Sequence, residues 1–176
     1  MSLMLFLFIG LLGALFINIF KRSIIEMVGE RNPLVQRLKN VSWFQNHWLA
    51  GIFLFLVNAG LFFTTGFVLF WLMSFLIPYV HFLVMFIAVM ASLYLWIIIN
   101  KAWQGTRRNQ LRMSVVGSSF YLILTLIFCY KLITLKPLFP GDDTFMRALG
   151  LELGLIVTTT AFISCFLFTS YSKQKS

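Results

Sequence analysis

The chain has 176 residues, of which 60% are hydrophobic and only 11% are charged, whereas soluble domains contain about 25% charged residues. A soluble protein of this size could not bury so much apolar surface, so we expect an all-α integral membrane protein with one polytopic domain over residues 1–176. The net charge of +9 lies in short basic clusters between hydrophobic runs. This pattern is typical of topology signals and anionic-lipid contacts, and it argues against a nucleic-acid partner.

The first hydrophobic run covers residues 3–20 and predicts the first transmembrane helix. It has no basic segment before it and no small-residue cleavage site, so we expect it to be retained. Lys21 and Arg22 follow it directly, which places the N-terminus outside. Gly10 and Ala14 are spaced to allow close helix approach, or are simply tolerated in lipid.

A short amphipathic helix is predicted on the cytoplasmic side, between the first and second spans. Asn32 before Pro33 is typical of a helix N-cap followed by proline in the first turn. Arg37 and Lys39 fall beside the apolar stripe of this segment and are candidates for contacts with anionic lipid or phosphate. The stripe consists of Leu34, Leu38, Val41 and Phe44. It would pack on the lipid surface or in a partner groove.

The stretch from residue 40 to residue 100 contains no charged residue. It is too long for one bilayer crossing of about 20 residues and too short for three crossings with turns. Because proline cannot continue a regular helix, Pro78 marks the predicted turn. We therefore expect the second and third spans at residues 48–77 and 79–100.

Residues 101–113 form the second predicted cytoplasmic loop, which is basic and contains no acid. Arg107, Arg108 and Arg112 are further candidates for contacts with anionic lipid or phosphate, or they only set the topology. The fourth span is predicted at residues 114–135.

The fifth span is predicted at residues 145–171, after a turn rich in Pro and Gly. The resulting arrangement, five spans with the N-terminus outside and the C-terminus inside, follows the positive-inside rule. It places eleven of the fourteen Lys and Arg residues on the cytoplasmic side.

Charged residues at membrane depth are expected to be functional or paired. Lys131 near the end of the fourth span and Glu152 near the start of the fifth have similar predicted depths. We expect an ion pair that fixes the packing of these two helices, with a proton or cation site as the alternative. Gly150 and Gly154 flank Glu152 and would let a neighbouring helix come close.

Other polar groups in the spans are few. Asn58 lies near the bilayer middle, where it either bonds between helices or lines a polar path. His81 and His47 are predicted at opposite membrane faces, which excludes a shared haem or metal. Cys129 and Cys165 fall in opposite leaflets, so we expect free thiols rather than a disulfide.

The chain contains no recognisable catalytic motif, such as GxSxG, HExxH or a Walker loop. We therefore expect a protein that is not an enzyme and needs no cofactor: an accessory, assembly or regulatory subunit of a larger membrane complex, or otherwise a homo-oligomer. The alternatives are a small-solute or ion transporter, or the substrate-binding subunit of one, and a lipid-modifying enzyme. The expected location is a bacterial plasma membrane, because no organellar targeting segment precedes the first span.

Overall fold

The computed structural model describes residues 32–74, 80–137 and 144–171. These residues form five α-helices and one 3-10 helix, and no strand occurs among them. A short helix α2 (Pro33–Lys39) and a 3-10 helix η1 (Ser42–Gln45) precede four long helices. The long helices are α3 (His47–Ser74), α4 (Val80–Ala102), α5 (Arg107–Ile133) and α6 (Phe145–Thr169).

The prediction of an all-helical fold is confirmed for this part of the chain. All four long helices are long and apolar enough to cross a membrane. The predicted first span at residues 3–20 and the predicted turn at Pro78 lie outside the described residues. The number of spans and their orientation therefore stay predictions.

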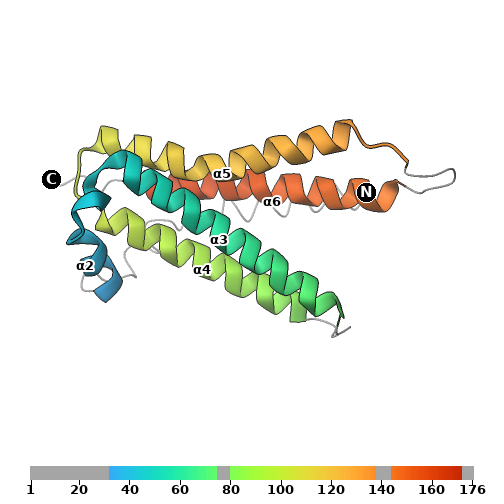
Figure 1. The fold of residues 1–176 in the computed structure, drawn as a ribbon, viewed down its shortest axis with the longest axis horizontal. Coiled ribbons are helices and arrows are strands. Elements are labelled where there is room, and N and C mark those ends of the chain that lie inside the picture. The colour runs from blue at the N-terminus through green and yellow to red at the C-terminus, as the bar shows by residue number, and fades with distance from the viewer. Residues whose placement is uncertain (1–31, 75–79, 138–143, 172–176) are drawn as a thin grey trace.

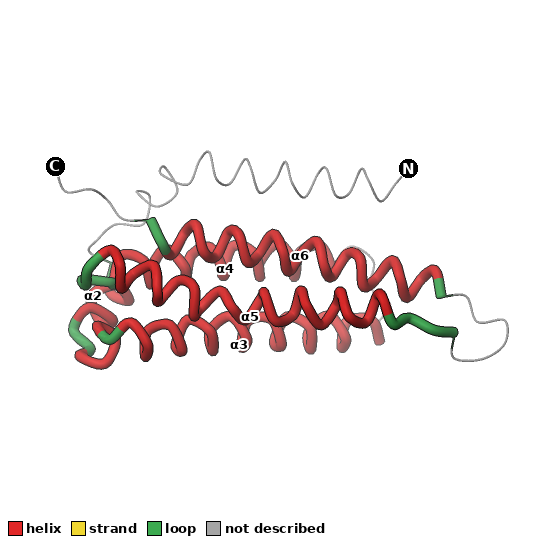
Figure 2. The backbone as a smooth tube through the Cα atoms, turned by 90° about the horizontal axis from the view of Figure 1, so that it is seen from above, coloured by secondary structure: helices red, strands yellow, loops and turns green. Residues whose placement is uncertain are grey.

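The four long helices form two antiparallel hairpins, α3/α4 and α5/α6, as Figure 1 shows. The hairpins meet through contacts of α3 with α5 and of α4 with α6, and α2 packs on α4. We call the end formed by residues 32–46, 103–106 and 170–171 the α2 end, and the opposite end the distal end. The hairpins are close at the α2 end and diverge toward the distal end (Figure 1). Seen at right angles in Figure 2, the long helices run along a common direction.

The packed core lies in the half of the bundle nearer α2. Among the described residues of the four long helices, every buried side chain lies in this half or at a helix midpoint. The largest fully buried ones there are Leu54 on α3, Ile98 and Ile99 on α4, Met113 on α5 and Phe168 on α6. The distal halves instead expose their apolar side chains, as expected of surfaces that face lipid.

Two glycines bring α3 and α5 into close contact. A Cβ atom at Gly117 would overlap the side chain of Leu54, and one at Gly51 would lie 2.8 Å from Cβ of Val116. Glycine allows this approach because it has no side chain, as in many membrane helix pairs. The sequence pattern did not single out either residue.

The start of α5 differs from the prediction. The fourth span was expected from residue 114, but α5 begins at Arg107, where the hydroxyl of Thr106 accepts a hydrogen bond from the backbone N–H of Asn109 at 3.4 Å. The segment 101–113, which was expected to connect two spans, is therefore helical from Arg107 onward. Hydropathy marks only the part of a helix that lies in the membrane, whereas arginine, glutamine, leucine and methionine favour a helix in water as well.

Candidate functional site

The buried amide of Asn58 links all four long helices. Its Nδ2 donates to the backbone oxygen of Gly117 on α5 at 3.1 Å and to Sγ of Cys165 on α6 at 3.4 Å. Its Oδ1 accepts a hydrogen bond from Nε1 of Trp96 on α4 at 2.8 Å. Asn58 itself is 0% exposed. The polar group predicted near the bilayer middle is thus a joint between helices.

These bonds use both hydrogens of the Asn58 amide nitrogen as well as its oxygen. A buried amide satisfied in this way has little capacity left for a passing solute. Of the two interpretations of Asn58, the structure shows hydrogen bonding between helices.

Two further amides hold the C-terminus of α6 at the α2 end. The last carbonyls of a helix have no partner within the helix itself. Nδ2 of Asn100 on α4 donates to the backbone oxygens of Phe168, Thr169 and Tyr171 at 2.7–3.0 Å. Nε2 of Gln110 on α5 donates to those of Thr169 and Tyr171 at 3.0 and 3.2 Å. Side chains from both hairpins therefore cap α6.

A pair of threonines sets the register of α5 against α6. The hydroxyl of Thr125 donates to that of Thr158 at 2.9 Å, and Thr158 donates to the backbone oxygen of Gly154 at 2.9 Å. The ring of Phe128 packs beside Gly154, 3.1 Å from where a Cβ atom would lie. Gly154 thus allows close packing of this hairpin, as its place in the GxxxG pattern suggested.

Lys131 and Glu152 lie at the same level of this hairpin. Lys131 is six residues beyond Thr125, and Glu152 is six residues before Thr158. Six residues turn an ideal helix by about 240°, so neither side chain points toward the other helix as Thr125 and Thr158 do. Because both helices are right-handed, the side chains of Lys131 and Glu152 point to opposite sides of the hairpin. Lys131 is exposed and Glu152 half-buried, and in the described part of the chain no ion pair joins them.

The histidines and cysteines do not gather into a site. His47 begins α3 at the α2 end, whereas His81 is half-buried in the first turn of α4 at the distal end. Cys129 and Cys165 are both free thiols. Within residues 32–74, 80–137 and 144–171, no cluster of three His, Cys, Asp or Glu side chains could hold a metal ion.

The predicted basic contact residues gather at one end of the molecule. Arg37 and Lys39 are on α2, and Arg107, Arg108 and Arg112 are on the first turns of α5. All are exposed except Lys39, which is half-buried. The structure therefore brings together two basic segments that are separated by two long helices in the chain.

Hydrogen bonds fasten α2 to this end. The side chain of Asn32 accepts from the backbone N–H of Leu34 at 3.0 Å, which confirms the predicted N-cap. Its Nδ2 donates to the hydroxyl of Tyr94 on α4 at 2.9 Å. Further along, Gln45 donates to the backbone oxygen of Lys39 at 3.3 Å and accepts from the backbone N–H of Gln104 at 3.2 Å.

A groove of about 240 Å³ lies between α2, α3 and α4. Its lining includes Leu34 and Leu38 of α2, Phe53 and Val57 of α3, and Ile98 of α4, and its one charged lining residue among the described residues is Arg37. The predicted apolar stripe of the amphipathic helix supplies two of these residues. The facing residues of α3 and α4 were not predicted, because hydropathy cannot separate a groove from a lipid-facing surface.

A comparison of the chain with protein-family models, with curated proteins and with solved structures finds no match. The class that the structure defines is a helical protein with four described helices long and apolar enough to span a membrane.

Proposed function

We propose that this chain is a non-catalytic accessory, assembly or regulatory subunit of a larger membrane complex. The observation that carries the proposal is the divergence of the two hairpins toward the distal end (Figure 1). Membrane helices associate largely through van der Waals packing, which the distal halves of the two hairpins do not give each other. A transmembrane helix of a partner would supply that packing.

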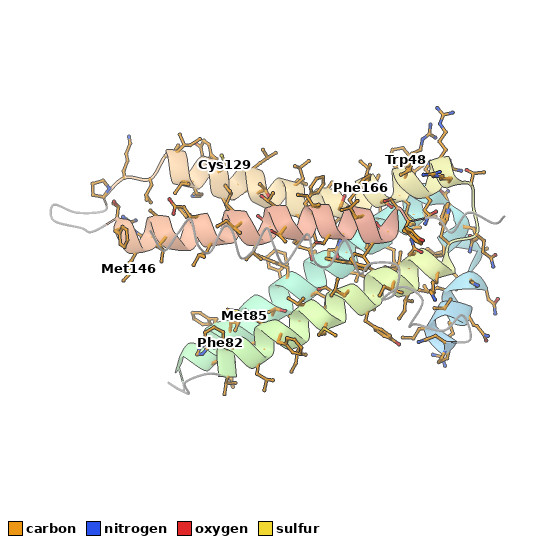
Figure 3. All side chains as sticks on the ribbon, turned by 180° about the vertical axis from the view of Figure 1, so that it is seen from behind. Trp48, Phe82, Met85, Cys129, Met146 and Phe166 are labelled. Carbon is orange, nitrogen blue, oxygen red and sulfur yellow. The ribbon has the colours of Figure 1, made fainter. Side chains whose placement is uncertain are left out.

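The distal halves present the large and small side chains that such a contact uses. Figure 3 shows Phe82 and Met85 at the distal end of one hairpin and Met146 at that of the other. Phe67 and Phe82 are 64% and 72% exposed. Gly66 and Gly150 in these halves, and Gly60 at the midpoint of α3, have nothing within 4 Å of where a Cβ atom would lie. These open positions would let a partner helix come close.

The arrangement of polar residues supports this function over transport. A transport path needs polar groups that converge on one cavity. Asn58 is enclosed in the half nearer α2, and its amide is already bonded within the bundle. His81, Lys131 and Glu152 lie in the distal halves of three different helices, and the groove at the α2 end is apolar.

The proposed orientation places the α2 end at the cytoplasmic face, against anionic headgroups. Its basic residues outnumber those of the distal end, where the described ones are Lys131, Lys136 and Arg147. The positive-inside rule then favours a cytoplasmic α2 end, with residues 3–20 as a fifth span that begins outside. A bacterial plasma membrane is the proposed location.

The test is gentle extraction of the tagged full chain from its native membrane, followed by mass spectrometry. A photo-crosslinking residue replaces Phe67 or Phe86 in the distal half, or, as a control, the exposed Leu49 at the α2 end. We expect a stoichiometric larger membrane protein that crosslinks from the distal positions and not from Leu49. A chain that is recovered alone, or crosslinks only to its own copies, contradicts the proposal.

A further inference from the structure

The groove at the α2 end is shaped for an extended apolar chain. Residues four apart in sequence lie one above the other on a helix. Two such pairs, Phe53 with Val57 on α3 and Leu95 with Ile99 on α4, form its walls, so the groove follows the direction of the long helices. At about 240 Å³ it is smaller than the sites of about 300–1,000 Å³ that hold compact ligands. A segment of an acyl chain fits it better than a folded metabolite does.

A positively charged side chain borders the end of the groove next to α2. Arg37 is exposed and contributes only apolar atoms to the lining. Leu34 and Leu38, one turn apart, flank it on the same helix. Lys39 follows two residues later, and no acidic residue occurs between residues 32 and 141. The elements that form the groove therefore offer Arg37 no carboxylate partner.

The groove is apolar, and the exposed Arg37 beside it has no carboxylate partner among the described residues. These two features match the acyl chain and the phosphate of a phospholipid. Guanidinium groups bind phosphate through charge-assisted hydrogen bonds, often in pairs. Basic pockets between membrane helices on the cytoplasmic side bind anionic headgroups. An extended peptide segment in this groove would have unpaired backbone amides, because the lining exposes only apolar atoms.

We infer that the groove between α2, α3 and α4 binds one anionic phospholipid, with the phosphate at Arg37 and an acyl chain along Phe53, Val57 and Leu95. The lipid acts as a structural ligand that holds α2 against the bundle. This inference is independent of the proposed subunit function, because it concerns the α2 end and not the distal halves.

The experiment uses the full chain in nanodiscs that contain equal parts of phosphatidylglycerol and phosphatidylcholine. After extraction into mild detergent, native mass spectrometry counts the lipids that stay bound. We expect one phosphatidylglycerol per chain. Arg37→Gln should lower its retention by about tenfold, the effect of losing one strong charge-assisted bond. The matched control, Arg112→Gln, removes an exposed charge on α5, away from the groove, and should leave retention unchanged.

A second pair of variants tests the acyl-chain site. Val57→Trp fills the groove and should abolish retention of phosphatidylglycerol, whereas Leu126→Trp, on the exposed face of α5, should not. If Val57→Trp loses helical content by circular dichroism, Leu34→Trp at the rim replaces it. Equal losses for Arg37→Gln and Arg112→Gln would show only diffuse attraction and overturn the inference. Full retention of phosphatidylglycerol by the folded groove-filling variant would also overturn the inference. The occupant of the groove would then be another part of this chain, a second copy or a partner protein.

Discussion

Nε1 of Trp96 on α4 donates a hydrogen bond of 2.8 Å to Oδ1 of Asn58 on α3. Through the other two bonds of Asn58, this contact reaches α5 and α6. In lipid no water replaces a lost hydrogen-bond partner, so the contact of the four helices depends most directly on the hydrogen bonds of the Asn58 side chain. It also lies in the half of the bundle where the hairpins converge (Figure 1).

Replacing Trp96 by phenylalanine should destabilise the protein by about 1–3 kcal/mol, because the oxygen of Asn58 is left buried without its donor. Trp103 supplies the matched control. Its Nε1 is buried and has no hydrogen-bond partner in the described part of the chain, so Trp103→Phe loses no such bond. Thermal unfolding of both variants in the same detergent gives the comparison. Equal losses of stability would contradict the role of the Trp96–Asn58 bond.

Adding a methyl group at Gly117 should separate α3 from α5. A Cβ atom there would overlap Leu54, so we expect Gly117→Ala to cost about 1–3 kcal/mol in the free energy of unfolding. Gly150→Ala is the control, because a Cβ atom at Gly150 meets nothing within 4 Å. That variant should keep the free energy of unfolding or raise it by up to about 1 kcal/mol, because alanine favours a helix more than glycine does. The close-contact interpretation fails if both alanines are tolerated equally.

Removing the Asn100 amide should loosen the end of α6. In Asn100→Leu, the carbonyls of Phe168, Thr169 and Tyr171 lose a common donor and only Gln110 remains to cap the last two. Amide hydrogen exchange in the last turn of α6 should then rise on the order of tenfold. Asn109→Ala is the control, because the helix cap uses its backbone N–H and not its side chain. Unchanged exchange in Asn100→Leu would show that the cap does not hold this end.

The positions of the long helices could be predicted from sequence, because a charge-free apolar run has few structures available in a membrane. The N-cap at Asn32 was predictable for a similar local reason. How the helices pack was not. Gly51 and Gly117 matter only because Val116 and Leu54 face them. In the sequence, Asn100 and Gln110 look like ordinary polar residues at the ends of spans, and only the structure shows that they cap the end of α6. Since an apolar side chain has the same hydropathy in a core and in lipid, the divergence of the hairpins could not be predicted from the hydropathy of the sequence.

Reversing the charges of Lys131 and Glu152 tests the ion pair expected from their matched depth. In the structure the two side chains share a level but leave the α5/α6 contact on opposite sides, as the register set by Thr125 and Thr158 requires. We therefore expect Lys131→Glu and Glu152→Lys to change the free energy of unfolding of the full chain independently. The change in the double variant should equal the sum of the two single changes within about 0.5 kcal/mol, as for sites that do not interact. A double variant that regains the stability lost in the single ones would show that the two charges do pair in the membrane. The hairpin would then have to rotate away from the Thr125–Thr158 hydrogen bond, and Thr125→Val would cost little.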